Sequence, residues 1–466
     1  MLDEIGVNII EGGFASVSEG DFQALKLMAK ENLKAEVCSM ARANLADIDA
    51  AIKTEVPGVH IVVPTSKIHL EYKLKMTMDE VLNLTVECID YAKKHGLIVE
   101  LSAEDGSRSD VNFLKRFFSL GADNGADRVC LCDTVGILTP ERSYELVAEL
   151  CKNINIPFGI HCHNDFGLAT VNTLAAVKAG ANHVHVTVNG LGERAGNAAL
   201  EEVVMVLSHL YGFKLSLKTE KLYELSRTVS RLTGIPVQPN KAIVGDNAFT
   251  HESGIHTKAI LSYPLTYEPL NPETVGFRRR FIVGKHAGLA GVKAMLEQLN
   301  IYPTEEQLAE IFRRVKSLGD KGKTVTDSDL QAIAEAVMGV PQIRPIKLKG
   351  LTVTTGDRIT PTASVRLEVN GQEFVEAGVG VGPVDAAINA IKKVGGAIAD
   401  VVLEEYHVKS ITGGTNAVVE VIVRLRKGDR IVTASGAHED IVMASVEAVL
   451  SGMNTLLSTY LNKNKK

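Results

Sequence analysis

Residues 1–212 repeat one pattern: a short run of β-branched residues, a polar loop, and a stretch with helical periodicity. Short apolar strands that alternate with amphipathic helices predict a parallel sheet covered by helices. A recurrence of roughly 25 to 35 residues is typical of an α/β fold, the (β/α)8 or TIM barrel, whose active site lies at the carboxyl ends of the strands. The predicted strands are residues 6–11, 35–40, 59–64, 97–102, 128–132, 157–161 and 184–189.

The barrel pattern is one unit short. Seven strands can be counted, whereas a closed barrel of this type has eight strand–helix units. Residues 1–6 have the pattern of a last helical turn that ends at Gly6 and leads directly into a strand. We therefore expect the first unit to be missing from this chain, and a form without it to be inactive or poorly folded because two strand edges are unpaired.

Two further domains are expected after the barrel domain of residues 1–212. Residues 213–345 are helical and loop-rich and predict linker or lid subdomains. In residues 346–466 the strand pattern returns. The predicted helices of the two regions are 304–318, 327–338, 383–393 and 438–451, and the predicted strands are 351–354, 363–369, 401–411 and 417–424.

The C-terminal domain resembles itself. Residues 384–391 align with residues 442–449, and each helix follows an apolar strand and a glycine-containing loop. A duplicated βββα unit predicts two sheets with helices on one face. Such a domain is either a ligand sensor or a dimerisation module, because a fold does not by itself give a function.

Composition narrows the class of protein. The net charge is −6, and the only basic clusters are residues 278–280 and the last four residues, so no nucleic-acid partner is expected. No export signal is recognisable, and no apolar run approaches the roughly 18 residues of a membrane helix. The six cysteines lack disulfide-like spacing. We expect a cytoplasmic protein with reduced thiols and no membrane partner.

The strongest chemical signal is His161-Cys162-His163 at the end of a predicted strand. Residues two apart on a strand face the same side, so His161 and His163 converge while Cys162 points away. Two neutral imidazoles at the mouth of a barrel form half of a divalent-metal site. An isolated pair of this kind is more often two hydrogen-bonded histidines, but the position at a barrel strand end favours the metal.

Other strand ends supply polar groups. Glu104 follows the strand at 97–102 and is a candidate acid–base or orienting group, and Thr134 is a candidate donor to a carboxylate. Asn197, which follows a glycine-rich turn, is expected to reach the metal directly or through water. His256, beyond the barrel, is a candidate general base on a lid. The remaining expected substrate-binding residues are Ser102, Cys130 and Arg194.

Together these residues resemble the family of 2-isopropylmalate, citramalate and homocitrate synthases. The resemblance covers almost the whole chain and is carried by His161-Cys162-His163-Asn164-Asp165-Phe166-Gly167, Asn189-Gly190-Leu191-Gly192-Glu193-Arg194-Ala195-Gly196-Asn197, Glu252-Ser253-Gly254-Ile255-His256, and Gly413-Gly414-Thr415-Asn416 in the C-terminal domain.

The resemblance implies a Claisen-type condensation of acetyl-CoA with a 2-oxoacid. It places a divalent metal ion (Zn, Mn or Mg) on His161, His163 and Asn197, where the metal would polarise the keto group. His256 with Tyr267 matches the family's candidate base, and Glu104 and Thr134 match positions that orient the oxoacid. A homodimer and a branched-chain amino-acid effector are also implied.

The chain departs from the family at its start. The family opens with an Asp-Thr-Thr-Leu-Arg-Asp-Gly-Glu-Gln motif that supplies a third metal ligand and a catalytic arginine, and this motif is absent here. Cys130 and the segment 62–69 look most like archaeal-type citramalate synthases, which use pyruvate and lead to isoleucine. The alternatives are a 2-isopropylmalate synthase of leucine biosynthesis, a non-catalytic regulatory subunit with a damaged barrel, and a barrel lyase, against which the C-terminal domain argues.

Overall fold

The computed structural model describes residues 1–282, 288–320, 325–339, 344–410 and 418–457. The chain forms two compact units. The first contains Met1–Phe249 and Asn271–Arg278, and the second contains Thr250–Leu270 and Arg279–Lys466. Among the described residues, no helix is long and apolar enough to cross a membrane.

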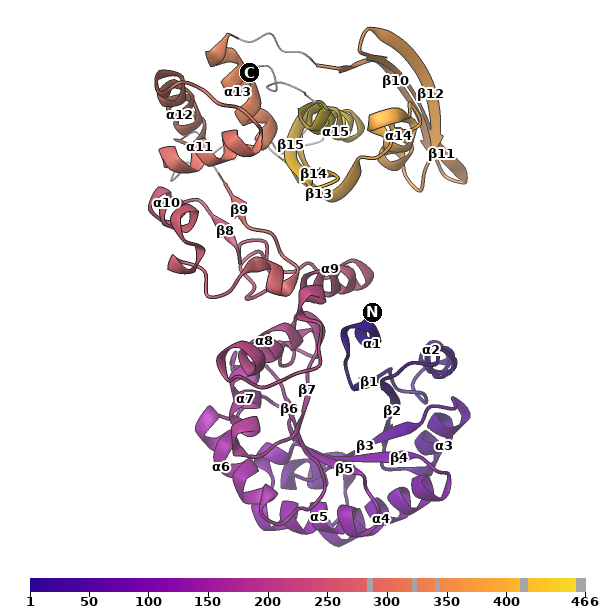
Figure 1. The fold of residues 1–466 in the computed structure, drawn as a ribbon. Helices are drawn as coiled ribbons and strands as arrows, with labels where there is room; N and C mark the ends of the chain where they lie inside the picture. The colour runs from indigo at the N-terminus through magenta and orange to yellow at the C-terminus, as the bar shows by residue number, and fades with distance from the viewer. Residues whose placement is uncertain (283–287, 321–324, 340–343, 411–417, 458–466) are drawn as a thin grey trace. The chain divides into compact units, whose positions relative to one another are not determined.

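The first unit is built on one parallel sheet of seven strands that follow one another in chain order. Figure 1 shows this sheet curled, with helices on its outer face. Among the described residues, β1 pairs only with β2 and β7 only with β6, so the curl is open between β1 and β7. The predicted TIM-barrel type of fold is confirmed. The strands are β1 (Ile9–Glu11), β2 (Glu36–Arg42), β3 (Gly58–Pro64), β4 (Ile98–Glu104), β5 (Arg128–Asp133), β6 (Phe158–Cys162) and β7 (His183–His185).

The outer helices begin at local capping residues. The Thr77 side chain accepts from the Glu80 backbone and the Glu80 side chain accepts from the Thr77 backbone, a capping box that starts α4. Pro140 starts α6 after the Thr139 cap, and Gly6 ends α1 with a φ of 101°, as predicted. The helices are α1 (Leu2–Ile5), α2 (Glu19–Lys30), α3 (Leu45–Lys53), α4 (Met78–Lys94), α5 (Val111–Asp123), α6 (Pro140–Cys151), α7 (Ala169–Ala179), α8 (Leu200–Met205) and α9 (Leu222–Thr233).

The main core lies between the outer face of the sheet and these helices, and it includes Phe117, Leu131 and Cys162. Because strand side chains alternate, the inner face of the curl carries a different set of residues. Many of those inner residues are polar or charged, including Glu100, Ser102 and Arg128. Polar groups buried in this way need partners, and these are described below.

The second unit begins with a small parallel pair, β8 (Thr250–His251) and β9 (Arg280–Phe281). Helices follow at α10 (Gly254–Ser262), α11 (Leu289–Gln298), α12 (Glu305–Asp320) and α13 (Asp327–Met338). The predictions of 304–318 and 327–338 match α12 and α13 to within two residues. Ile311 and Leu330, both fully buried, join these helices in one core with α11.

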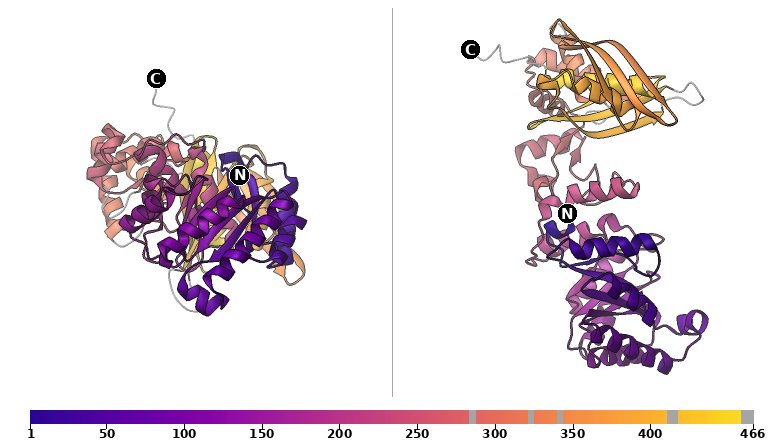
Figure 2. Two further views of the ribbon diagram at one scale, coloured as in Figure 1. Left: turned by 90° about the horizontal axis from the view of Figure 1, so that it is seen from below. Right: turned by 90° about the vertical axis from the view of Figure 1, so that its right-hand side faces the viewer.

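The C-terminal domain confirms the predicted duplication. Two three-stranded antiparallel sheets are each followed by a helix that packs on the sheet, and the two helices contact each other within one core. Figure 2 shows both sheets with their helices. The first repeat contains β10 (Ile346–Gly356), β11 (Ile359–Val369), β12 (Gln372–Val379) and α14 (Pro383–Lys392), and the second contains β13 (Val402–Ser410), β14 (Val419–Lys427), β15 (Arg430–His438) and α15 (Ile441–Leu457).

The strand predictions missed β12 and β15, although the sequence of the turn before each strand indicates a hairpin. Asn370 and Gly371 have φ values of 51° and 84° in the turn between β11 and β12. Asn-Gly is the preferred sequence of such hairpin turns. Gly428, with a φ of 56°, lies in the turn between β14 and β15. The Gly413–Asn416 motif lies outside the described residues.

Equivalent glycines let each helix approach its sheet closely. A Cβ added at Gly378 of β12 would lie 2.4 Å from the Ala390 nitrogen, and one at Gly436 of β15 would lie 2.4 Å from the Ala444 oxygen. Both contacts involve helix backbone, which cannot move away as a flexible side chain does. The two repeats therefore share a packing contact as well as a pattern.

The Gly436→Ala variant is expected to lower the free energy of unfolding of this domain by about 1–3 kcal/mol, because the new methyl group overpacks against α15. Chemical denaturation measures the change. Gly350→Ala on β10 is the matched control, since its Cβ would meet only Arg366 Cβ at 3.9 Å. Equal stability of the Gly436→Ala protein and the wild type would contradict the close approach.

Candidate active site

The two histidines of the sequence motif meet at the carboxyl end of β6. Their Nε2 atoms are 3.2 Å apart, and Cys162 between them is buried in the opposite, outer core. Burial, together with the neighbouring His185 and His163, lowers the pKa of His161 to about 3. Burial and the Arg194 guanidinium also lower the pKa of His163. Both imidazoles are therefore neutral near pH 7, the form that binds metals.

Asn197 joins this pair. Its Nδ2 atom is 3.1 Å from His161 Nε2 and donates to the Cys162 carbonyl at 3.3 Å. The glycine-rich loop makes the approach possible, because a Cβ on Gly192 would lie 1.8 Å from Asn197 Oδ1. Gly196 has a φ of 95°, a conformation that favours glycine.

These three side chains fit a divalent metal ion in part. The Nε2 atoms of two neutral imidazoles converge, and the amide group of Asn197, whose oxygen is the atom that could bind a metal, lies beside them. Among the described residues, no third His, Cys, Asp or Glu atom joins the pair at ligand spacing. The donor set is thus suited to a metal but leaves coordination positions open.

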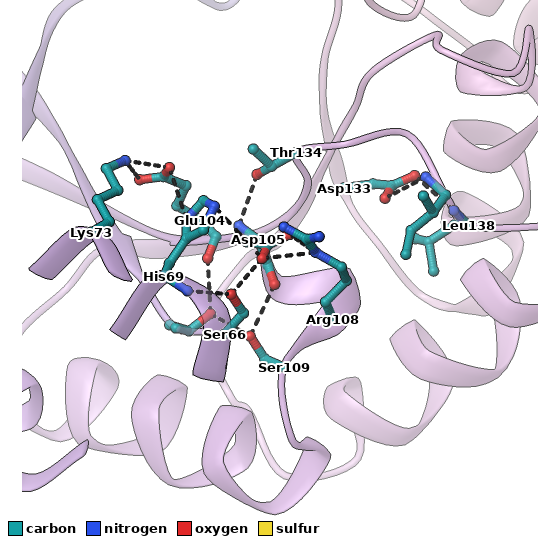
Figure 3. Close-up of polar contacts among 12 residues, drawn as sticks. Ser66, His69, Lys73, Glu104, Asp105, Arg108, Ser109, Asp133, Thr134 and Leu138 are labelled. Carbon is teal, nitrogen blue, oxygen red and sulfur yellow. Dashed lines mark hydrogen bonds and ion pairs between the residues drawn. The ribbon is translucent and has the colours of Figure 1, made fainter. Parts of the chain in front are cut away.

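Glu104 lies at the end of β4 in a polar cluster (Figure 3). Its two carboxylate oxygens accept from Lys73 Nζ at 2.6 and 2.8 Å, and Oε1 is 3.2 Å from His69 Nδ1. His69 and Lys73 belong to one π-helical turn, η1 (His69–Leu74). Both were missed by the sequence interpretation, although the turn begins a few residues after the carboxyl end of β3.

Thr134 is hydrogen-bonded to the backbone of Asp105, the residue that follows Glu104. The Asp105 amide donates to Thr134 Oγ1 at 2.8 Å, which leaves the hydroxyl proton of Thr134 free to donate to a substrate. Asp105 itself is fully buried. Its carboxylate accepts from Arg108 Nε at 2.8 Å and from Ser66, so it holds the loop in place (Figure 3).

Arg194 connects the loops after β5, β6 and β7. Its guanidinium pairs with Asp165 at 2.7 Å, and Nη2 donates to the Thr134 carbonyl at 2.7 Å. The side chain is 44% exposed, so it remains accessible to a ligand carboxylate.

A cavity of about 270 Å³ opens beside Asn197, and Lys241 forms an ion pair with Glu202 in its wall.

Ser102 and Cys130 lie deeper, inside the curl, and both are fully buried. Ser102 Oγ is 2.5 Å from His60 Nε2, and His60 Nδ1 is 2.5 Å from Glu11 Oε2. Burial opposes protonation of His60, but Glu100 and Glu11 raise its pKa to about 9. The sequence interpretation missed His60 and Glu11. The feature that could have identified them is a titratable side chain at a strand position that faces the inside of the curl.

His256 and Tyr267 belong to the second unit. Their rings are stacked, with centroids 4.0 Å apart and an interplanar angle of 26°. His256 is exposed and Tyr267 is 45% exposed. The structure thus brings together the two side chains that the sequence paired as a candidate base.

Three known family profiles match consecutive parts of the chain. The profile of the HMGL-like family matches residues 1–229, that of the homocitrate synthase post-HMGL domain matches residues 243–323, and that of the LeuA allosteric (dimerisation) domain matches residues 324–457. The order of the three matches along the chain is the order of barrel, linker and duplicated domain.

Relatives that align with nearly the whole chain include the following three. A putative (R)-citramalate synthase of Methanothermobacter thermautotrophicus is 56% identical over 98% of this chain and 92% of its own length. An (R)-citramalate synthase of Methanocaldococcus jannaschii is 55% identical over 98% and 94%. A 2-isopropylmalate synthase of the same organism is 50% identical over 98% and 89%. The chain therefore belongs to the HMGL-like enzyme family, in the group that contains the (R)-citramalate and 2-isopropylmalate synthases.

Proposed function

We propose that this protein condenses acetyl-CoA with pyruvate to form (R)-citramalate, as an acyltransferase of isoleucine biosynthesis. The observation that carries the proposal is the convergence of His161, His163 and Asn197 at the mouth of the curled sheet. The names of the two most similar relatives reported above support the same reaction.

The side chains at the mouth of the sheet have different roles in the proposed reaction. His161, His163 and Asn197 hold a divalent metal, which when bound supplies Lewis-acid polarisation of the keto group. Thr134 donates a hydrogen bond from its hydroxyl to the carboxylate of the oxoacid, and Arg194 adds a positive charge. Glu104, held by Lys73 and His69, orients the keto acid.

The proton of the acetyl methyl group goes to a base, for which we assign His256 with Tyr267 stacked against it. The resulting enolate attacks the keto carbon, and water then cleaves the thioester and releases coenzyme A. Cys130 and Ser102, buried beneath the mouth, shape the bottom of the oxoacid site.

A steady-state assay of free thiol release from acetyl-CoA, with pyruvate and 2-oxoisovalerate compared, tests the proposal. We expect kcat/KM to favour pyruvate by about 10- to 200-fold, the discrimination that small differences in apolar volume provide. A preference for 2-oxoisovalerate would assign the protein as a 2-isopropylmalate synthase. No thiol release from either oxoacid by the metal-loaded protein would favour a regulatory subunit.

We further propose that the duplicated domain binds isoleucine and that it holds two chains together as a homodimer. The match to the LeuA allosteric (dimerisation) domain supports both roles. Calorimetry on the intact protein should detect isoleucine binding, and thiol release should fall at saturation. Binding of leucine alone would favour the leucine pathway, and binding of neither amino acid would leave the domain as a dimerisation module.

A further inference from the structure

A second group of potential metal ligands lies inside the curled sheet. Three of them lie nearer the amino ends of the strands than His161 and His163, and the fourth, His185, lies in register with His161. Glu100 on β4, Cys130 on β5, and His183 and His185 on β7 each offer one ligand atom, and these four atoms all lie within 4.8 Å of one another. Glu100 is 2% exposed and Cys130 is fully buried. A carboxylate, a thiolate and two imidazoles are donors of tetrahedral zinc sites.

The register of the sheet explains how residues on separate strands meet. Cys130 pairs with Gly159, and Gly159 pairs with His183, so the three residues form one row across β5, β6 and β7. A Cβ at Gly159 would lie 2.1 Å from His183 Nε2. The missing side chain of Gly159 therefore provides the space in which the His183 ring lies across β6.

The ring nitrogens of His183 lack hydrogen-bond partners among the described residues. Both nitrogens are also buried. The carboxylate atom Glu100 Oε1 is 3.5 Å from His183 Nε2 and 2.6 Å from His185 Nε2. A buried polar atom without a partner destabilises the fold, and an ion at this point would remove that cost.

The carboxylate of Glu100 is oriented for a ligand role. Its Oε2 atom accepts from Arg128 Nε at 2.5 Å, while Oε1 faces the histidines. Arg128 also pairs with Glu36 at 2.7 Å, and the charges of these two residues balance. Hydrogen bonds of this kind commonly fix the ligands of metal sites. A doubly charged ion would balance the remaining carboxylate and a thiolate at Cys130.

We propose that Glu100, Cys130, His183 and His185 bind a Zn²⁺ ion that links β4, β5 and β7 from inside the curl, separate from the metal at His161 and His163. Ligand atoms of a tetrahedral zinc ion with bonds of 2.0–2.3 Å lie about 3.3–3.8 Å apart. The four side chains reach that spacing by adjustments of about 1 Å.

Cobalt(II) titration of the metal-stripped full-length protein tests the site. A thiolate bound to cobalt(II) gives a sulfur-to-metal charge-transfer absorption in the near ultraviolet, and the His161 site contains no sulfur. The wild type is expected to show this band and to bind two cobalt ions per chain. Cys130→Ser should lose the band and one ion, whereas His163→Ala should lose the other ion and keep the band.

Two further variants keep the result interpretable. Cys151→Ser removes a half-buried thiol of α6 and should leave the band unchanged. His183→Gln keeps the thiol, so the band should remain but require at least about 10- to 100-fold more cobalt, the loss that follows even from changes in residues that only support a ligand. Absence of the band in the wild type, its survival in Cys130→Ser, or unchanged cobalt affinity in His183→Gln would each overturn the proposal.

Discussion

The His163→Ala protein is expected to lose about 10³-fold or more in kcat/KM for thiol release, because metal polarisation contributes several kcal/mol and each 1.36 kcal/mol is tenfold in rate. His163 Nε2 is 3.2 Å from His161 Nε2, so its loss leaves one imidazole and Asn197. Elemental analysis of the purified variant should show one fewer metal ion per chain than in the wild type.

His95→Ala is the matched control for this substitution. His95 is exposed at the end of α4, where its Nδ1 donates to the Tyr91 carbonyl at 2.9 Å. Its replacement should leave both metal content and thiol release unchanged. Full metal content together with wild-type activity in His163→Ala would show that this histidine is not a ligand.

The Arg128→Met protein is expected to lose about 3–5 kcal/mol in the free energy of unfolding of the first unit, the usual effect of removing one partner from a buried ion pair. Arg128 is 7% exposed and holds Glu100 at 2.5 Å and Glu36 at 2.7 Å. Without it, two carboxylates remain in the interior with no neutralising guanidinium. Chemical denaturation in chelator-containing buffer measures the change without a metal contribution.

Arg116→Met provides the comparison, because Arg116 pairs with Asp79 at 2.9 Å on the surface, where the two side chains are 64% and 75% exposed. Its loss should cost at most about 1 kcal/mol. Adding Glu36→Gln to Arg128→Met should recover part of the stability, since one unpaired charge is then removed. Similar unfolding midpoints for the two single variants would contradict the proposed importance of the interior pair.

The repeating pattern of the first 212 residues was sufficient to predict the parallel sheet, and the self-similarity of the last domain was sufficient to predict its duplication. Both features depend on local periodicity, which each segment carries by itself. The same reasoning correctly placed Cys162 on the side opposite His161 and His163, because alternation along a strand needs no information about other strands. The strands β12 and β15 were missed because the Asn370-Gly371 and Gly428 turns before them were not recognised as hairpin turns.

Only the tertiary structure decided which distant residues meet. Asn197 reaches His161 because a glycine-rich loop folds back over β6. Arg128 meets Glu36 because the sheet curls and brings β2 and β5 to a common interior. Glu100, Cys130, His183 and His185 come from three different strands, and only the folded sheet brings them together. Register and curvature join segments far apart in the chain, so both depend on contacts between strands and not on the periodicity within one strand.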